Sequence, residues 1–386
     1  MSEYQRLYDL GEIKMHISIV IPLFHGKKYI PILLENISEN YEYANRYFPC
    51  EAEVIFVNDC EDDIGDMDLA IWPIPISVLL NSKNVGIHYS RVHGLKAAKG
   101  QYVLFLDQDD HIDKRFIYSQ MRKIEGYDVI VCNGIYRNNR LIMQDKKEMD
   151  QIEDPEYYFS VMNIIVSPGQ ALIKKSVIPE EWIRNILKGN SCDDVFLWLL
   201  MKSKDLKFKV NDEVLYYHNE GHGNTSFLWE NNATAWKEMY EVIARNRLIQ
   251  GERFLRIKKR VESQIDKYSQ YAQLESFFSD LNSIQVEEYM RKKGYNTIAV
   301  YGYGVFGKKF IDYLQATQIK IAYAIDENVK AFRDSNMDLF SPEDELGTVD
   351  AVVVSAIFAF DEIRGKLEKK MSCDIVALDK LLTDCI

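Results

Sequence analysis

Short apolar runs alternate with segments of helical spacing in the N-terminal part of the chain. Four runs are expected to be strands, at residues 17–21, 52–57, 76–80 and 102–106, and residues 29–38 place apolar side chains at helical spacing. The runs are apolar on both faces, which is typical of parallel strands covered by helices on each side of a sheet. The pattern therefore predicts an α/β domain with a parallel sheet.

The strand pattern continues less regularly after this region. Residues 128–132 are expected to form another strand, and residues 170–173 and 208–217 are expected to add edge or mixed strands before the first domain ends near Ser226. Open parallel sheets bind ligands at the carboxyl ends of their strands. Acidic residues follow two of the expected strands there, so this edge is the expected ligand site.

Two further parts follow the first domain. Residues 227–293 contain one glycine and no proline and are rich in helix-forming residues, which indicates a helical connector or packing layer. A second parallel pattern then begins, with a helix ending near residue 316 and strands expected at 297–301, 319–325, 351–355 and 375–378. The expected organisation is therefore a first domain at 1–226, a helical connector at 227–295 and a smaller parallel-sheet domain at 296–386.

Composition and charge narrow the classes of protein. The 386 residues are 47% hydrophobic and 27% charged, ordinary globular values that exclude wholesale disorder and a fibrous repeat. The net charge of −12 disfavours nucleic-acid binding, because a phosphate backbone would meet a repulsive field. No apolar stretch reaches the roughly 18 to 20 residues that span a bilayer, and the N-terminus lacks a signal-peptide core. We therefore expect a cytoplasmic protein.

The cysteines and one basic segment add little chemistry. The six cysteines lie far apart without a Cys-x-x-Cys pair, so free or buried thiols are favoured over a zinc site or disulfide framework. A cluster of basic residues could touch an anionic membrane surface, although a solvated helix face is favoured: Arg253, Arg256, Lys258, Lys259 and Arg260. Peripheral association with the inner face of the membrane and a homo-oligomer are both left open.

The sharpest chemical signal is Asp107-Gln108-Asp109-Asp110, directly after an apolar strand. Alternation along an extended chain places Asp107 and Asp109 on one side, where two carboxylates can converge on a divalent cation. Mg²⁺ or Mn²⁺ held in this way keeps open positions for phosphate oxygens of a substrate. The alternative is an acidic loop that caps the helix expected near Lys114.

The sequence before this cluster gives it a context. The segment from Asn84 to Gly100 leads directly into the strand and the cluster, and Val57-Asn58-Asp59 ends an earlier strand. In their order and approximate spacing, these motifs resemble those of the family 2 glycosyltransferases. The resemblance covers residues 15–226 and implies a GT-A fold, an α/β domain that binds a nucleotide sugar. The chain departs from the family pattern at Asn58 and Cys60, where the family often has Asp and Gly.

The resemblance implies a set of residues that bind the nucleotide sugar: Pro22, Phe24, Asp59, Asn84, Gly86, Arg91, Asp107 and Gln108. Asp59 would accept a hydrogen bond from the uracil ring, with turn stabilisation as the alternative. Arg91 offers a guanidinium fork suited to phosphate, or it could be an ion-pair partner of an Asp in the acidic cluster. Asp109 would ligate the cation, joined by His222, which fits the family's terminal loop better than His218.

Asp193 and Asp194 begin an apolar helix and resemble the family's Glu-Asp motif, with Asp193 in place of Glu. The resemblance implies that Asp194 is the catalytic base and that Asp193 is a positioning group. Capping of the helix N-terminus is the alternative for either aspartate.

Together these roles imply a metal-dependent inverting hexosyltransferase. Asp194 would take a proton from an acceptor hydroxyl while the sugar leaves a nucleoside diphosphate, expected to be UDP. The acceptor would belong to a bacterial surface polysaccharide, a lipid-linked glycan or a glycoprotein. The alternatives are a catalytically inactive nucleotide-sugar-binding or assembly module, and a nucleotidyltransferase, which is weakened because no glycine-rich phosphate loop follows the first strand.

The C-terminal part contains Gly302-x-Gly304-x-x-Gly307 between an expected strand and an expected helix. Asp326 ends the next strand about 20 residues after Gly304, the spacing of a Rossmann-type turn that binds a phosphate-bearing ligand. The part resembles small Rossmann-like modules attached to bacterial surface-sugar enzymes. A ligand-binding or scaffold module, with a nucleotide as its ligand, and a working dinucleotide enzyme are the two alternatives.

Overall fold

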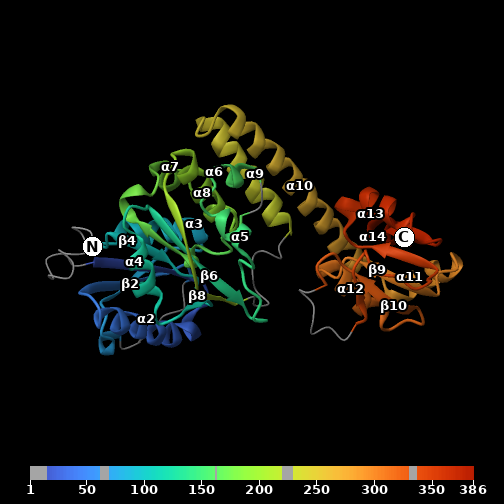
Figure 1. Ribbon diagram of the computed structural model, residues 1–386, viewed down its shortest axis with the longest axis horizontal. Helices are drawn as coiled ribbons and strands as arrows, with labels where there is room; N and C mark the ends of the chain where they lie inside the picture. Colours follow the sequence, from blue (N-terminus) through green and yellow to red (C-terminus); the bar gives the residue numbers. More distant parts are fainter. Residues whose placement is uncertain (1–14, 61–68, 161–162, 220–228, 330–336) are drawn as a thin grey trace. The chain divides into compact units, whose positions relative to one another are not determined.

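The computed structural model describes residues 15–60, 69–160, 163–219, 229–329 and 337–386 (Figure 1). The chain forms two compact units, Met1–Ile265 and Asp266–Ile386, and the division falls within helix α10 (Gly251–Asp280). Helices α9 (Trp229–Asn246), α10 and α11 (Ser283–Lys292) lie in the range expected for a helical connector. Each unit has a sheet of its own.

Within its described residues, unit 1 has an eight-stranded sheet in the order β3-β2-β1-β4-β7-β6-β8-β5. Its strands are β1 (Met15–Leu23), β2 (Cys50–Asn58), β3 (Ile76–Leu80), β4 (Tyr102–Phe105), β5 (His111–Ile112), β6 (Val129–Tyr136), β7 (Ala171–Lys174) and β8 (Phe208–His218). The first four strands pair in parallel, whereas β7 is antiparallel to both β4 and β6. The expected α/β class is confirmed, and β7 lies inside the sheet as a mixed strand rather than at an edge.

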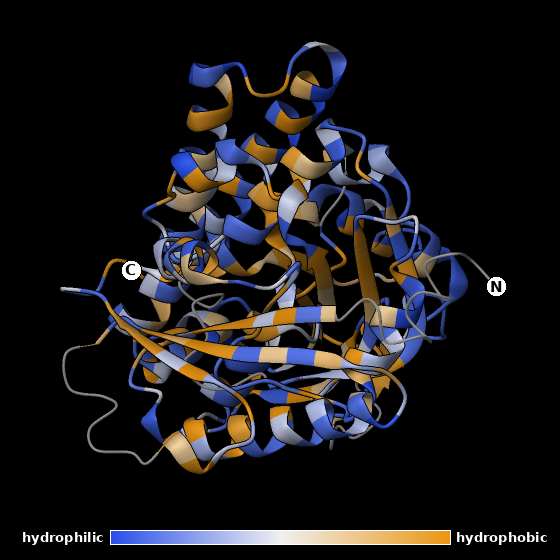
Figure 2. Cartoon of the chain, turned by 90° about the vertical axis from the view of Figure 1, so that its left-hand side faces the viewer, coloured by the Kyte–Doolittle hydropathy of each residue, from blue (hydrophilic) through white to orange (hydrophobic). Residues whose placement is uncertain are grey.

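Helices cover both faces of this sheet (Figure 2). Ile19 and Val20 of β1 point to opposite faces, and both are fully buried. α3 (Ile87–Ala97) packs on β1 and β2, and α2 (Ile30–Asn45) packs on β2 and on α4 (Phe116–Lys123). Burial on both faces explains why these strands are apolar at successive positions.

Shorter helices complete unit 1: α5 (Lys146–Asp150), α6 (Pro155–Ser160), α7 (Glu180–Arg184) and α8 (Asp193–Ser203), with 3₁₀ turns at Lys27–Tyr29, Leu69–Ile71, Pro168–Gln170 and Lys175–Val177.

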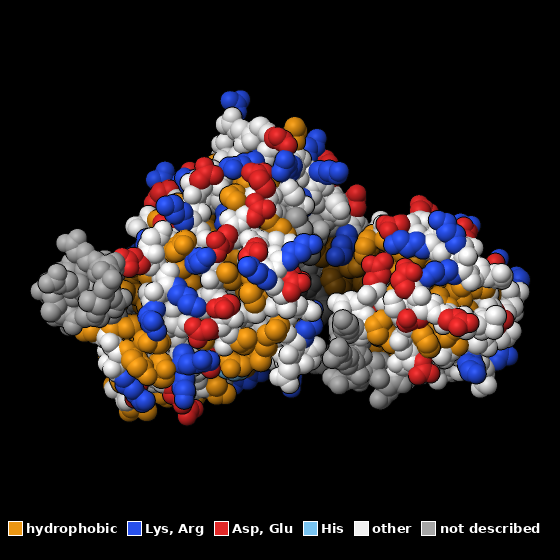
Figure 3. Space-filling model, in the orientation of Figure 1, with side chains coloured by type: hydrophobic (Ala, Val, Ile, Leu, Met, Phe, Trp, Pro, Cys, Tyr) orange, Lys and Arg blue, Asp and Glu red, His pale blue; other side chains and the backbone are white. Residues whose placement is uncertain are grey.

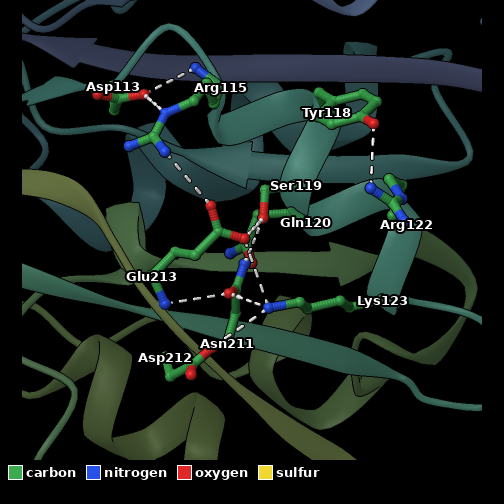
Figure 4. Close-up of polar contacts among 10 residues, drawn as sticks. All are labelled: Asp113, Arg115, Tyr118, Ser119, Gln120, Arg122, Lys123, Asn211, Asp212 and Glu213. Carbon is green, nitrogen blue, oxygen red and sulfur yellow. Dashed lines mark hydrogen bonds and ion pairs between the residues drawn. The ribbon is translucent and has the colours of Figure 1, made fainter. Parts of the chain in front are cut away.

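A buried polar network joins α4 to β8 (Figure 4). The side chain of Asn211 is fully buried, and its Nδ2 donates to Ser119 Oγ and to Gln120 Oε1, each at 3.0 Å. Its Oδ1 accepts from Lys123 Nζ at 2.6 Å. Ser119 Oγ in turn donates to a carboxylate oxygen of Glu213 at 2.5 Å. The network fixes α4, the helix that follows the acidic cluster, on the sheet.

Basic residues of α10 serve packing within unit 1. Arg253 and Arg256 both pair with Glu156 of α6, at 3.1 and 2.9 Å. Arg260 is buried, and its Nη1 donates to the carbonyl oxygen of Tyr158 at 2.7 Å. None of the helices in the described part of the chain has the apolar stretch that a membrane crossing needs. On the face that Figure 3 shows, acidic and basic side chains are intermingled.

Unit 2 has, within its described residues, a five-stranded parallel sheet in the order β11-β10-β9-β12-β13. After the end of α10 and α11, its elements are β9 (Thr297–Tyr301), α12 (Val305–Leu314), β10 (Lys320–Ile325), β11 (Leu339–Phe340), β12 (Ala351–Val354), a 3₁₀ turn (Ile357–Ala359), α13 (Phe360–Leu367), β13 (Asp374–Ala377) and α14 (Leu378–Thr383). The expected strands are confirmed to within one residue at each end. β11, a two-residue strand, was not expected.

Candidate active site

The carboxyl ends of β1, β2 and β4 meet at one edge of the sheet, because these neighbouring strands are parallel. Gln108, after β4, bridges to the residue that follows β1. Its Oε1 accepts from Phe24 N at 2.9 Å, and its Nε2 donates to Phe24 O at 3.1 Å. Phe24 is half exposed, and Pro22 lies one residue from the end of β1. The loops after two strands are thus held together where a ligand site was expected.

Arg91 joins this edge to the start of α8. The side chain is buried in α3, where its Nη2 donates to Asp107 Oδ1 at 2.5 Å and its Nη1 donates to Asp193 Oδ2 at 2.7 Å. Burial alone would lower the pKa of Arg91, but the carboxylates of Asp193 and Asp107 more than offset it and raise the pKa. Of the two roles considered for Arg91, the ion pair with the acidic cluster is the one that the structure shows.

The first two acidic side chains of the cluster differ in their partners. Asp107 Oδ2 accepts from Ser167 Oγ at 2.9 Å, so both of its oxygens are engaged. Among the described residues, Asp109 pairs with no lysine or arginine. Burial, and then the charges of Asp110 and Asp107, raise the pKa of Asp109 to about 6.

Asp109 is a carboxylate of the type that hard divalent cations prefer as a ligand. Its oxygens take part in no ion pair with the described residues, and nearby carboxylates make a positive charge favourable there. No three side chains of the His, Cys, Asp or Glu type are gathered for a metal ion within the described ranges. His222, the expected second ligand, lies outside them.

His218, the histidine that sequence analysis placed second, lies against Asp110. Asp110 is buried and accepts from Tyr216 Oη and from Asn219 N, the latter at 2.7 Å. His218 Nδ1 lies 3.2 Å from Asp110 Oδ1. Through these contacts Asp110 links the end of β8 to the loop after β4.

Asp59 is buried at the end of β2, and its carboxylate organises the loop before α3. Its Oδ1 accepts from Val85 N and Asn81 Nδ2, each at 2.9 Å, and its Oδ2 accepts from Gly86 N at 2.8 Å. This geometry is that of the turn-stabilising alternative, and the uracil contact stays a prediction. Gly86 has φ of +92°, and a Cβ there would lie 2.6 Å from Asn190 Oδ1. Asn84 is exposed on this loop.

Asp193 and Asp194 have different environments at the start of α8. Asp193 is buried and ion-paired, whereas Asp194 is half-buried and accepts a long hydrogen bond from Asn163 Nδ2 at 3.4 Å. Burial, and then the charge of Asp193, raise the pKa of Asp194 to about 7. Neither aspartate is the N-cap, which is Cys192 at φ +69°. Asp194 is thus the more exposed and the less tightly paired carboxylate of the two.

A buried histidine supports the segment that leads to these aspartates. His88 Nδ1 accepts from Leu187 N at 2.9 Å, and its Nε2 lies 3.2 Å from the carbonyl oxygen of Trp182. Burial lowers the pKa of His88, so the neutral ring with a proton on Nε2 satisfies both contacts. Sequence analysis did not single out His88, Asn163 or Ser167 as site residues, because their partners lie far away in the chain.

The glycine-rich turn of unit 2 is a separate cluster. Gly302 has φ of +91°, Gly304 is the N-cap of α12, and a Cβ at Gly307 would overlap the carbonyl oxygen of Gly302. Asp326, after β10, accepts from Tyr303 N at 2.8 Å. The structure brings these predicted residues together, and their role toward a ligand stays a prediction.

Comparison with known proteins places these motifs in a family. Residues 18–178 match the model of glycosyl transferase family 2. An uncharacterized glycosyltransferase of Haemophilus influenzae is 32% identical over 207 residues, which cover 52% of this chain and 67% of that protein. The poly(ribitol-phosphate) β-N-acetylglucosaminyltransferase TarS of Staphylococcus aureus is 32% identical over 136 residues, 34% of this chain.

The chain spans only 23% of the length of TarS in that alignment. The crystal structure of residues 1–349 of S. aureus TarS superposes with a TM-score of 0.48 and 17% identity, covering 72% of this chain and 79% of that one. The match to the family and the similarity to the H. influenzae protein agree with the motifs that the structure gathers around Arg91. The chain therefore belongs to the family 2 glycosyltransferases.

Proposed function

We propose that this glycosyltransferase is a metal-dependent, inverting hexosyltransferase that moves a sugar from a nucleoside-diphosphate sugar, a UDP-sugar, to a hydroxyl group. The observation that carries the proposal is the pairing of one buried guanidinium, Arg91, with Asp107 after β4 and Asp193 in α8. It draws the carboxylates proposed for the donor side and those proposed for the acceptor side into one cluster. A single displacement needs both sets in one site, because the acceptor oxygen must attack the carbon that carries the leaving group.

Asp194 is the proposed general base. A carboxylate whose pKa lies near 7 is ionised at slightly higher pH and still basic enough to accept a proton efficiently. Asp194 takes the proton of the acceptor hydroxyl as that oxygen bonds to C1 of the sugar. The bond from C1 to the diphosphate oxygen breaks, and the nucleoside diphosphate leaves with the bonding electrons. Asp193, locked by Arg91, holds the start of α8 in place.

Asp109 is the proposed ligand of Mg²⁺ or Mn²⁺, together with His222. When bound, such a cation would neutralise negative charge on the departing diphosphate. Asp107, braced by Arg91 and Ser167, is proposed to face the ribose or groups bound to the cation. The remaining proposed donor contacts are Pro22, Phe24, Asp59, Asn84, Gly86 and Gln108.

The proposed acceptor is a surface polysaccharide, a lipid-linked glycan or a glycoprotein. Among the relatives, the name of TarS specifies transfer of N-acetylglucosamine to poly(ribitol phosphate). For unit 2 we propose a phosphate-bearing ligand on the turn of Gly302, Gly304 and Gly307, with Asp326 beside it. A turn at the N-terminus of a helix suits such a ligand.

A donor screen tests the proposal. Nucleotide sugars are offered with Mn²⁺ or Mg²⁺, and release of nucleoside diphosphate is measured with and without an acceptor extract. We expect Asp194→Asn to lower transfer about 100-fold or more, because general bases typically contribute that much. Binding of UDP should be unchanged in this variant, and Glu180→Gln, at an exposed ion pair, is the matched control. Transfer by Asp194→Asn at a near wild-type rate would refute the base assignment.

A further inference from the structure

A groove of about 500 Å³ lies between helix α9 and the segment that leads to Asp194. Lys188, Gly189 and Asn190 form one wall, and side chains of α9 that include Asn231 and Thr234 form the other. The groove lies within unit 1. Helix α9 lies beyond residues 18–178, the part of the chain that matches the family model, so that match assigns no role to this wall.

The two walls are held together by defined contacts. The carboxylate of Glu238 in α9 accepts from Lys188 N at 2.9 Å and from Gly189 N at 3.1 Å. Gly189 also packs so closely on α9 that a Cβ there would lie 2.7 Å from Ala235 Cβ. The groove is therefore a built feature of unit 1, because the Glu238 carboxylate bonds to the backbone of the opposite wall and Gly189 packs directly on Ala235.

The groove borders on the loop proposed to bind the donor and on the segment that leads to the proposed base. Asn190 Oδ1 accepts from Ile87 N at 3.2 Å, at the start of α3, where the donor loop ends. Asn190 also limits the space beside Gly86 of that loop. In the other direction, Asp194 follows Asn190 by four residues, in the first turn of α8. A molecule in the groove would thus lie next to the donor loop and next to the segment that carries the base.

The lining favours an uncharged polyhydroxyl ligand. Two lysines, Lys188 and Lys237, balance two glutamates, Glu238 and Glu241, so the formal charges of the walls cancel. Lys237 lies 4.0 Å from Glu241, and Glu238 is already occupied by backbone N–H groups. The exposed amide of Asn231 and hydroxyl of Thr234 can each donate and accept hydrogen bonds, as sugar hydroxyls require. A polyanion would find no excess positive charge there.

We infer that this groove is a binding site for the acceptor, and that the part of the acceptor it holds is a neutral carbohydrate. Asn231 and Thr234 of α9 contact its hydroxyl groups and set acceptor specificity. The inference rests on the proposed function, since it assigns the groove to the acceptor of the same transfer.

The test compares the wild-type chain with Asn231→Ala/Thr234→Ala and with Thr234→Trp, which fills the groove. The probes are neutral disaccharides of hexose and N-acetylhexosamine, with hexose phosphates for comparison, and binding is measured by titration calorimetry and saturation-transfer NMR. Loss of two hydrogen-bonding groups should weaken binding of a neutral disaccharide about tenfold. Thr234→Trp should abolish it. Arg245→Ala, exposed on the same helix and outside the groove, is the matched control and should bind like the wild type.

Binding of UDP and hydrolysis of the donor in the absence of acceptor are measured for the same variants. Both should be unchanged, because the substituted side chains lie on the acceptor side. If the wild type neither binds UDP nor hydrolyses any donor, the proposed function itself is wrong. If it does so while no neutral disaccharide binds, only hexose phosphates bind, or the groove variants bind neutral sugars as well as the wild type, the groove assignment alone is overturned.

Discussion

The change of Asp193 to Asn tests whether the buried ion pair with Arg91 organises the site. Both side chains are buried, and the pairing distance is 2.7 Å. Removal of one partner from a buried ion pair costs about 3 to 5 kcal/mol, because the other charge stays buried and uncompensated. Arg91 keeps Asp107 as a second partner, so we expect a loss near the lower value, about 3 kcal/mol.

Tryptophan fluorescence during urea unfolding gives this value for unit 1 alone. All five tryptophans of the chain lie within Met1–Ile265. With a slope of about 2 to 3 kcal/mol per molar urea, the expected loss moves the midpoint by roughly 1 M. Glu180→Gln removes one partner of an exposed pair with Arg184 and should cost about 0.2 to 1 kcal/mol. If Asp193→Asn costs no more than Glu180→Gln, the pair with Arg91 does not hold α8 in place, and the reasoning fails.

Further expectations concern the carboxylates and the network of Figure 4. The logarithm of kcat/KM should fall with unit slope as pH drops below about 7, because protonated Asp194 cannot accept a proton. A decrease in kcat/KM that begins only near pH 4 would contradict this. In the folded protein Asp194 keeps its proton up to a pH of about 7, whereas in the unfolded chain it loses the proton above its ordinary pKa. The contribution of Asp194 to the free energy of unfolding therefore falls as pH rises from that ordinary pKa to about 7. At pH 8, Asp194→Asn should unfold at a higher urea concentration than the wild type. Excess EDTA should abolish transfer and Mn²⁺ restore it, and Asp109→Asn should raise the metal concentration needed for half activity; full activity in EDTA would remove the role given to Asp109. Asn211→Ala should lower the free energy of unfolding by about 2 kcal/mol, since Ser119 and Lys123 lose a buried partner, and an unchanged urea midpoint would show that the network is not needed.

Strand positions could be predicted because burial on both faces leaves an unbroken apolar run. Apart from β11, the strands of unit 2 were found in this way, as were β1 to β4, all to within a few residues. The position of a strand within the sheet was harder to predict from the sequence. β7 is short and apolar, and nothing in its own residues indicates that it lies antiparallel between β4 and β6. β5 was missed because two residues, His111 and Ile112, carry no periodicity.

The motifs of the site could be predicted from the sequence, but the interaction partners of their side chains could not. Arg91 has two roles that sequence alone cannot separate, because its partners Asp107 and Asp193 are brought together only by the fold. Asp59 illustrates the same limit, since a carboxylate at a strand end can face a ligand or the backbone of the next loop. The partners of His88 and Asp194 also come from segments far away in the chain.

One guanidinium shared between two carboxylates is expected to couple the effects of substitutions at positions 91, 107 and 193. A Glu at position 193 would place its carboxylate one methylene further into a contact that is only 2.7 Å in length. Such a change is expected to be tolerated only together with a compensating change at position 91 or 107. Each of these replacements made alone is expected to give a less stable protein. Mutational paths that alter this site should therefore show strong epistasis among the three positions, and libraries that vary them jointly should recover active combinations that stepwise selection misses.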